Sequence, residues 1–271
     1  MVAERAPEEA AQAEAAQEVD RGRAAEGMAG LAKGLAIVEA FGPQRTRLSV
    51  TEAARATDIS PATARRCLLT LEAAGYVSYD GKYFRPTPRM VRLGAAYLET
   101  SPLPLLAQPH VLAARDELAE SVSLAVLEGD NSVFVARAEV ARIVSTGARL
   151  GAQLPAHASA TGRVLLAALP DAEVEELLAR ADLQRTTPNT LTSVEAIRER
   201  VQRARVDGIA STDEELALGM RSMAVPVRDA RGRTVAAMSV AAFAARISLA
   251  EMQATFAPVL LRHATRLGKM L

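Results

Sequence analysis

The hydrophobic positions between Ser49 and Gly75 recur at helical spacing and predict two short helices separated by a tight break. The break falls at residues 57–59, Thr-Asp-Ile. The second helix opens with Ser60 as its N-cap and Pro61 in its first turn, which are favoured residues at those positions. Its buried stripe is predicted to contain Ala64, Cys67, Leu68 and Leu71.

The opposite face of this second helix is predicted to carry polar groups near its start. At about 100° per residue, Ala62, Arg66 and Leu69 project away from the buried stripe, and Thr63 and Thr70 flank them. Such a pair of helices is typical of a helix-turn-helix, whose second helix lies in the major groove of DNA. The alternative is an ordinary helical hairpin with solvated arginines.

The next segment favours the DNA-binding interpretation. Residues 76–85 alternate apolar and polar positions on both sides of Asp80-Gly81, which is a strong signal for a β-hairpin. A hairpin directly after a recognition helix predicts the wing of a winged helix. We expect Lys82 and Arg85 to contact phosphate, and Tyr79 and Tyr83 to lie along the sugar edge.

Helices are predicted on both sides of this motif. An apolar stripe predicts an amphipathic helix over residues 28–41, which would complete the core beneath the wing. The stripe consists of Leu31, Leu35, Val38 and Phe41. Arg45 and Arg47 follow in a loop and are predicted to face phosphate. After the wing, an apolar edge predicts a connecting helix that suits packing against a second copy; it is formed by Met90, Leu93 and Tyr97.

The remainder of the chain alternates predicted helices and strands. Hairpins are expected over residues 122–138 and 223–242, with short strands at 142–147 and 209–212. Helices are expected at residues 105–120 (interrupted at Pro109), 159–168, from Asp171, 193–206 and 249–271. This order predicts an α+β fold built on an antiparallel sheet. The predicted division is a disordered tail (1–26), a winged helix-turn-helix (27–86), a linker helix (87–101) and a C-terminal domain (102–271).

Composition and charge narrow the class of protein. One cysteine among 271 residues excludes a disulfide framework, and no apolar run approaches the roughly 18 residues of a membrane span. Without a signal pattern at its N-terminus, the chain is expected to be cytoplasmic. Residues 28–100 hold ten basic and six acidic residues, whereas the whole chain has no net charge. This basic block is typical of a contact with nucleic acid.

The search for chemistry finds no catalytic motif. His157 and Ser159 stand two residues apart and suggest a nucleophile with a base, but Ser159 is better explained as an N-cap and no acid partner is evident. His110 and His263 have no companion at metal-ligand spacing, so we expect no metal and no cofactor. Apolar segments with a few hydroxyls favour a small-molecule site instead. Ordinary capping and core hydroxyls are the alternative.

Six ordered stretches together resemble the isocitrate lyase regulator (IclR) type of bacterial transcription factor. They are LAKGLAIVEAF, LSVTEAARATDISPATARRCLLTLEAAGYV, RLGAAYL, LPAHASATGRVLLA, GIASTDEELALGMRSMAVPV and AAMSVAA. The resemblance implies a winged helix, a linker helix and a GAF-like effector-binding domain. It also implies a homodimer or tetramer that binds a double-stranded DNA operator and a small organic acid effector.

The resemblance also implies the residues of the effector site, whereas the DNA-contacting residues follow from the helical spacing and the wing. The effector is expected to meet Ile143, Thr146, Ala160, Thr161, Thr212, Met220, Ser222, Ser239 and Ala241. The major groove is expected to meet Thr63, Arg65, Arg66 and Thr70, of which Thr63 and Arg66 match the family's T-x-x-R pattern, while Lys82, Tyr83 and Arg85 position the wing.

The predicted effector is an aromatic acid or its β-ketoadipate-pathway product. The general pattern is similar to the subgroup that controls protocatechuate, p-hydroxybenzoate and β-ketoadipate catabolism, with Arg149 or Arg221 as the carboxylate partner. Glyoxylate-responsive members have aspartate, cysteine and serine where this chain has Thr212, Ser222 and Ala241. A regulator of glyoxylate or pyruvate metabolism, a ligand-binding enzyme and a protein-docking adaptor are the alternatives.

Overall fold

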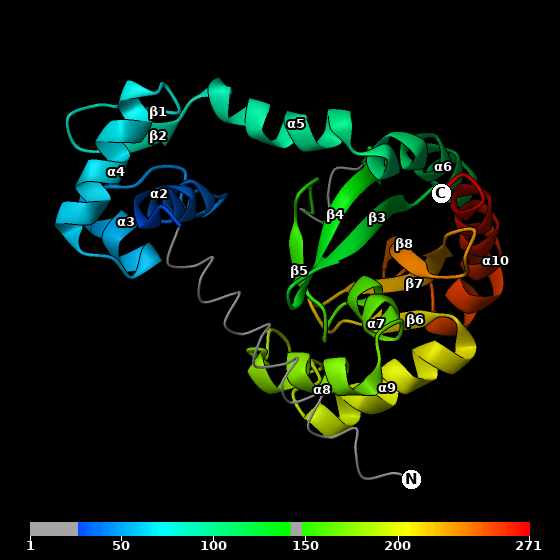
Figure 1. Ribbon diagram of the computed structural model, residues 1–271. Coiled ribbons are helices and arrows are strands. Elements are labelled where there is room, and N and C mark those ends of the chain that lie inside the picture. Colours follow the sequence, from blue (N-terminus) through cyan, green and yellow to red (C-terminus); the bar gives the residue numbers. More distant parts are fainter. Residues whose placement is uncertain (1–26, 142–147) are drawn as a thin grey trace, which may run out of the picture. The chain divides into compact units, whose positions relative to one another are not determined.

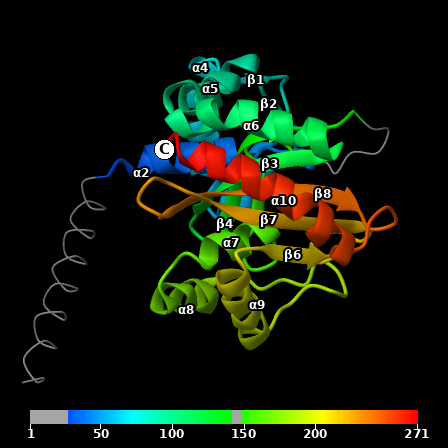
Figure 2. The ribbon, with the colours of Figure 1, turned by 90° about the vertical axis from the view of Figure 1, so that its right-hand side faces the viewer.

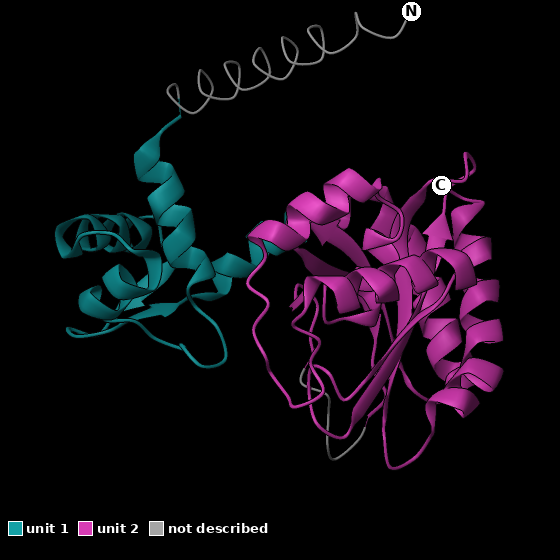
Figure 3. Cartoon of the chain, turned by 90° about the horizontal axis from the view of Figure 1, so that it is seen from below, with its two compact units in different colours: residues 1–96 teal, residues 97–271 magenta. Residues whose placement is uncertain are grey.

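The computed structural model describes residues 27–141 and 148–271 (Figure 1). The strand predicted at residues 142–147, with Ile143 and Thr146, lies outside the described residues. The chain divides into two compact units, residues 1–96 and residues 97–271, which Figure 3 shows in different colours.

The first unit is a small winged helix, as predicted. Its helices are α2 (Ala29–Glu39), α3 (Val50–Thr57) and α4 (Pro61–Ala73), followed by the antiparallel hairpin of β1 (Val77–Tyr79) and β2 (Phe84–Pro86). Local chemistry sets the helix ends. Ser49 and Glu52 form a capping box on α3, Asp58 ends α3 in the left-handed conformation, and Ser60 caps α4. The buried core consists of Ile37, Leu48, Ala53, Ala54, Ala64, Leu68, Val77 and Phe84.

The apolar stripe predicted for the first helix is only partly correct: Val38 is half-buried and Phe41 packs against the core, but the two leucines do not. Leu31 and Leu35 are 61% and 47% exposed, whereas Ile37 is fully buried. One narrow face of α2 meets the small core, and it is the face centred on Ile37, so the flanking leucines stay in solvent. Leu69 on α4 was also expected to project outward, but it is half-buried against the same core.

A 3₁₀ turn, η1 (Pro88–Met90), leads into α5 (Val91–Thr100), which spans the division between the two units. Thr87 caps the turn by accepting a hydrogen bond from the backbone N–H of Arg89. Met90 packs against the winged-helix core. The apolar residues Val91, Leu93 and Tyr97 of α5 are exposed.

The second unit is built on a six-stranded antiparallel sheet with the order β5-β4-β3-β8-β7-β6. Its strands are β3 (Ser121–Glu128), β4 (Asn131–Ala138), β5 (Gln153–Pro155), β6 (Ala210–Asp213), β7 (Met220–Arg228) and β8 (Thr234–Phe243). The two predicted hairpins are present, and β8 pairs with β3 to join them. The edge strand β5 was not predicted. The antiparallel sheet and the helices between and after its strands confirm the predicted α+β class.

Helices cover both faces of this sheet (Figure 2). On one face lie α6 (Pro102–Leu118) and α10 (Leu249–Gly268); on the other lie α7 (Ala160–Leu166), α8 (Asp171–Arg180) and α9 (Val194–Asp207). Helix α6 was expected to break at Pro109, but it continues through it. Ala107 and Val111 on either side of the proline are buried against the sheet, and this packing outweighs the backbone hydrogen bond that proline cannot make. Within the described ranges, no helix is long and apolar enough to span a bilayer.

Alternation along the strands separates two interiors. In β8, Met238 and Val240 belong to the core beneath α6 and α10, whereas Ser239 and Ala241 face the opposite side. In β7, Met223 belongs to that core and Ser222 faces the opposite side. The sheet therefore presents small and polar side chains toward α7.

Candidate functional site

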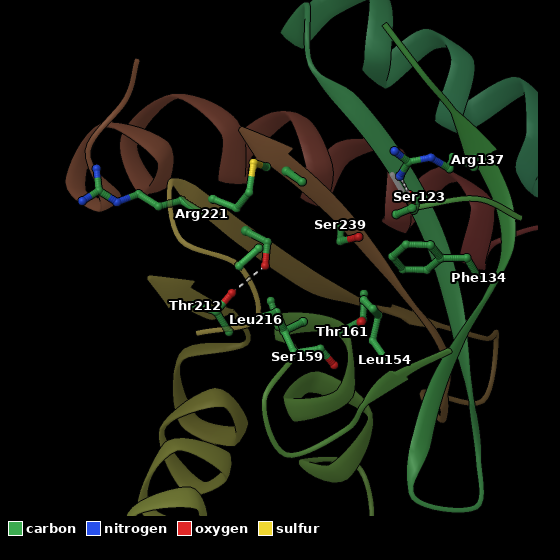
Figure 4. A pocket seen from close by; sticks show the side chains of 16 residues that line it. Ser123, Phe134, Arg137, Leu154, Ser159, Thr161, Thr212, Leu216, Arg221 and Ser239 are labelled. Atoms are coloured by element: carbon green, nitrogen blue, oxygen red, sulfur yellow. Dashed lines mark hydrogen bonds between the residues drawn. The ribbon is translucent and has the colours of Figure 1, made fainter. Parts of the chain in front are cut away.

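A cavity lies between this polar face of the sheet and helix α7 (Figure 4). It contains about 720 Å³ of space not filled by atoms, its open mouth included. Its apolar walls include Phe134, Leu154, Leu216 and Met220, and its polar lining comes from hydroxyls and arginine.

Seven of the nine residues predicted for the effector line this cavity. They are Ala160, Thr161, Thr212, Met220, Ser222, Ser239 and Ala241. The other two, Ile143 and Thr146, lie outside the described residues. The pairings Thr212↔Ser222 and Ser222↔Ala241 place these residues side by side on the consecutive strands β6, β7 and β8. The start of α7, about 50 residues earlier in the chain, packs against these strands.

Four hydroxyls of the cavity lining, those of Ser159, Thr161, Thr212 and Ser222, belong to two small networks. Thr212 Oγ1 lies 2.6 Å from Ser222 Oγ. The hydroxyl of Ser132 lies 2.8 Å from that of Thr161 and 3.2 Å from that of Ser159. Ser159 also caps α7 by accepting a hydrogen bond from the backbone N–H of Gly162. Its hydroxyl is thus engaged in the structural role that the sequence indicated.

Arg137 on β4 is a cavity residue that sequence analysis missed. Its side chain is 8% exposed, its Nη1 donates a 2.6 Å hydrogen bond to Ser123 Oγ on the neighbouring strand, and its Nη2 donates to the Glu139 carboxylate at 3.4 Å. The guanidinium lies 5.8 Å from the ring centre of Phe134, which lines the same cavity. The available signal was an arginine in the apolar strand SVFVARA. A charged side chain is rarely buried in such a strand unless it has a polar partner or a ligand.

Arg221 and Arg149, the two arginines that the sequence suggested as carboxylate partners, are placed differently from Arg137. Arg221 Nε donates a 2.6 Å hydrogen bond to Asp213, and Nη1 donates to the carbonyls of Ala244 and Ile247 at 3.0 and 2.8 Å. The hydrogen bond to Asp213 raises the pKa of the Arg221 guanidinium. In Figure 4 this guanidinium points away from the other labelled side chains. Arg149 is exposed and is not among the residues that line the cavity.

In the first unit, the predicted DNA-contacting residues of α4 lie at its surface. Arg65, Arg66 and Thr70 are exposed, and Thr63 is half-buried. Thr70 donates to the backbone carbonyl of Arg66, and Thr63 Oγ1 lies 2.9 Å from the Ser60 hydroxyl. Neither arginine has a carboxylate partner among the ion pairs of the described residues.

The wing and the loop before α3 are brought together by Tyr83. The Arg47 guanidinium lies 4.1 Å from the centre of the Tyr83 ring, and Lys82 Nζ lies 5.2 Å from it. Arg45 is exposed and shares a small hollow with Arg47 and Arg55. Arg85 pairs with Asp80 at 3.5 Å. Tyr83 of the hairpin therefore brings the positive charges of Arg47 and Lys82 together around its ring.

One expectation about the wing needs adjustment, that for Tyr79. Tyr79, predicted to lie along the sugar edge, stacks on Phe84 with ring centres 4.4 Å apart. Its hydroxyl donates a 2.6 Å hydrogen bond to the carbonyl of Gly81. It therefore supports the turn. The carboxylate of Asp80 accepts the backbone N–H groups of Lys82 and Tyr83, which lowers its pKa and keeps it charged beside Arg85.

The histidines form no recognisable catalytic or metal-binding group. His110 and His263 face each other with ring centres 6.1 Å apart. Among the described residues, no cluster of three or more His, Cys, Asp or Glu side chains could hold a metal ion. His157 is 3% exposed, and burial lowers its pKa. Its Nε2 has no hydrogen-bond partner within the described part of the chain.

Comparison with known proteins decides the family. The family model for the C-terminal domain of IclR-type bacterial transcriptional regulators matches residues 95–268, and the model for the IclR helix-turn-helix domain matches residues 30–81. The chain belongs to the IclR family. The resemblance seen in the sequence is thereby confirmed, and the chain is a transcriptional regulator that binds DNA through its helix-turn-helix and responds to a small organic effector.

Two curated IclR relatives and one solved structure are informative. The Pca regulon regulatory protein of Pseudomonas putida is 39% identical over 235 residues, 86% of this chain and 81% of the relative. The p-hydroxybenzoate hydroxylase transcriptional activator of Acinetobacter baylyi is 41% identical over 220 residues, 78% of this chain and 80% of the relative. An IclR homologue from Microbacterium hydrocarbonoxydans, solved in complex with 4-hydroxybenzoate, is 27% identical with a TM-score of 0.72, covering 89% of this chain and 98% of that one.

Proposed function

We propose that this regulator controls a catabolic operon and senses a small aromatic acid of the p-hydroxybenzoate or protocatechuate class. The observation that carries the proposal is the polarity of the cavity. Arg137 supplies a positive charge on β4, whereas Thr161, Ser222 and Ser239 supply hydroxyls elsewhere in the lining. Phe134, Leu154 and Leu216 supply apolar contacts for a ring. An acid that carries a ring hydroxyl matches all three features.

The carboxylate is expected to bind Arg137. Arginine presents a planar fork of N–H donors that matches a carboxylate. Its attraction for the carboxylate is stronger in a cavity from which the aromatic ring of the effector displaces water. The hydroxyls can donate to or accept from a ring hydroxyl, so they suit a phenol better than an alkyl chain. The relatives named for protocatechuate and p-hydroxybenzoate regulation, and the homologue bound to 4-hydroxybenzoate, support the same class.

Isothermal calorimetry on the full-length protein tests this class. We expect saturable heat with p-hydroxybenzoate or protocatechuate, or with β-ketoadipate if the pathway product is the effector. Glyoxylate is the decisive comparison, because it carries a carboxylate but no ring for the apolar walls. Heat with glyoxylate alone would reject the aromatic class and favour the glyoxylate or pyruvate alternative.

The operator is expected to meet the outer face of α4 and the wing. Thr63, Arg65, Arg66 and Thr70 would address base edges, and phosphate or sugar contacts would come from Arg45, Arg47, Lys82, Tyr83 and Arg85. The exposure of Arg65 and Arg66 supports this role. Binding to operator fragments of altered sequence tests it, since base contacts discriminate between sequences and phosphate contacts do not.

We further propose that the protein is a homodimer or tetramer that binds its effector without turning it over. A twofold-symmetric regulator predicts a palindromic operator whose half-sites are about one helical turn apart, or a multiple of that spacing. Since its target is the operator, it acts in the cytoplasm. Light scattering measures the assembly, and recovery of the unchanged acid after prolonged incubation tests the absence of turnover.

A further inference from the structure

One buried ion pair connects two sides of the effector cavity that are distant in sequence. Helix α7 contributes Ser159, Ala160 and Thr161 to one side. Residues 214–219, the loop between β6 and β7 that we call the cover loop, contribute Leu216 and Ala217. Arg163 of α7 and Glu215 of the cover loop join the two sides.

The ion pair between Arg163 and Glu215 also fixes the relative orientation of the two side chains. Arg163 is 1% exposed, and its Nη1 and Nη2 donate to the two carboxylate oxygens of Glu215 at 2.8 and 2.5 Å. Its Nε donates to the carbonyl of His157 at 3.0 Å. A two-point contact between a planar guanidinium and a carboxylate admits few relative orientations. Leu216, the next residue, is therefore held at a defined place in the cavity wall.

Residues 186–190, between α8 and α9, also hold the cover loop by hydrogen bonds to its backbone. Thr190 and Thr186 hydroxyls donate to the backbone carbonyl of Glu215 at 2.6 and 2.9 Å, and the Thr187 hydroxyl donates to that of Glu214 at 2.7 Å. Within the loop, the backbone N–H of Gly219 donates to the Glu214 carboxylate at 2.6 Å. Glu214 has a φ of 57°, which a non-glycine residue adopts at a cost. The loop is thus pinned in a conformation that its own backbone does not favour.

We propose that Arg163 and Glu215 are positioning residues that hold the cover loop against the cavity before the effector arrives. A buried ion pair adds little net stability, since apolar residues of similar volume often replace one without loss. Its fork geometry instead keeps Leu216 and Ala217 in place, so that the effector does not have to order them on binding. The proposal rests on the assignment of this cavity as the effector site.

The test uses the full-length protein with both charges removed, R163M/E215L. Removing both avoids leaving one uncompensated charge in the interior. Two quantities are measured: hydrogen exchange of the cover-loop amides without ligand, and the affinity for p-hydroxybenzoate by calorimetry. We expect faster exchange at Glu214 and Gly219, an affinity weaker by about tenfold, and a melting temperature near that of the wild type.

The matched control is R203M/E199L, which removes an exposed ion pair on α9. It should change neither exchange in the cover loop nor the affinity. R163K is the second variant if the double variant does not fold, because lysine keeps the charge but loses the fork; it should weaken binding in the same direction. Unchanged exchange together with unchanged affinity would overturn the positioning role. If the wild type gives heat with none of p-hydroxybenzoate, protocatechuate and β-ketoadipate, the effector class fails, and the exchange measurement still decides the role of the pair.

Discussion

The polar residues predicted to bind DNA are mostly exposed in the first unit, whereas those predicted to bind the effector are mostly buried in the second. In the winged helix, the predicted DNA contacts such as Arg65 and Arg66 are exposed and the small core is apolar. In the effector unit, Thr161, Thr212 and Ser239 are buried around a cavity. Substitutions on the outer face of the first unit should therefore have little effect on its folding. Substitutions around the cavity of the second unit should affect folding more, because the interior is closely packed.

The largest expected effect is a change in packing at the start of α7. A Cβ at Gly162 would lie 2.2 Å from Ala156 Cα and 2.3 Å from its carbonyl oxygen. Gly162→Ala should therefore destabilise the effector unit by about 3 kcal/mol or more. Thermal unfolding of the full chain measures it.

The matched control is Gly34→Ala on α2, where a Cβ would meet nothing within 4 Å. Because alanine favours a helix, this change should stabilise the winged helix by about 0.5–1 kcal/mol. Equal destabilisation by both substitutions would remove the contrast between the two units.

The next effect concerns recognition inside the cavity. Arg137→Gln removes the charge expected to bind the effector carboxylate and should cost about 1.5–3 kcal/mol of binding free energy, which is the range for hydrogen bonds to charged groups. Calorimetry with p-hydroxybenzoate measures this cost. Arg149→Gln is the control, since Arg149 is exposed and should leave the affinity unchanged. A loss with Arg149→Gln but none with Arg137→Gln would restore the partner suggested by the sequence.

The outer face of α4 provides the corresponding test in the winged helix. Arg66→Ala should cost about 1–3 kcal/mol at the operator and relax sequence preference at one position, provided that it reads a base. Fluorescence anisotropy with operator and scrambled duplexes measures both. Arg200→Ala, an exposed arginine of the effector unit, should have no effect. Equal operator affinity in the wild type and Arg66→Ala would refute base contact by Arg66.

The smallest effect is expected at a phosphate contact. Arg45→Ala should weaken binding by a similar factor for every sequence and reduce the slope of log affinity against log salt by about one. A salt titration of the wild type and the variant gives the two slopes. A change in sequence preference with an unchanged slope would assign Arg45 to base contact instead.

Local signals explain which parts of the fold could be predicted from sequence. Caps at Ser49, Ser60 and Ser159 and the Asp80-Gly81 turn act within a few residues, so the helix starts and the hairpin follow from the pattern. The buried face of α2 did not follow, because Leu31 and Ile37 both suit a core and only tertiary packing decides between them. The edge strand β5 is too short to leave a periodic signal.

The cavity shows the same limit. Thr212, Ser222 and Ala241 were named from the resemblance, and the sheet register that groups them is visible only in the structure. Arg137 was missed because its place depends on pairing with Ser123 and on an irregularity in the β3–β4 register after Leu124. A lone arginine in a strand gives no motif. Arg221 was suggested as a carboxylate partner, and it does line the cavity, but its guanidinium is hydrogen-bonded to Asp213.

The most direct test of this account is the operator affinity of the full-length protein, measured by anisotropy with DNA from beside its own coding region, with and without saturating p-hydroxybenzoate. The wild type should change its operator affinity when the acid is added, and Arg137→Gln should bind the same DNA equally well without responding at that concentration. An identical response in both proteins, or operator binding that the acid never alters, would contradict the claim that the buried cavity controls the exposed DNA-binding face.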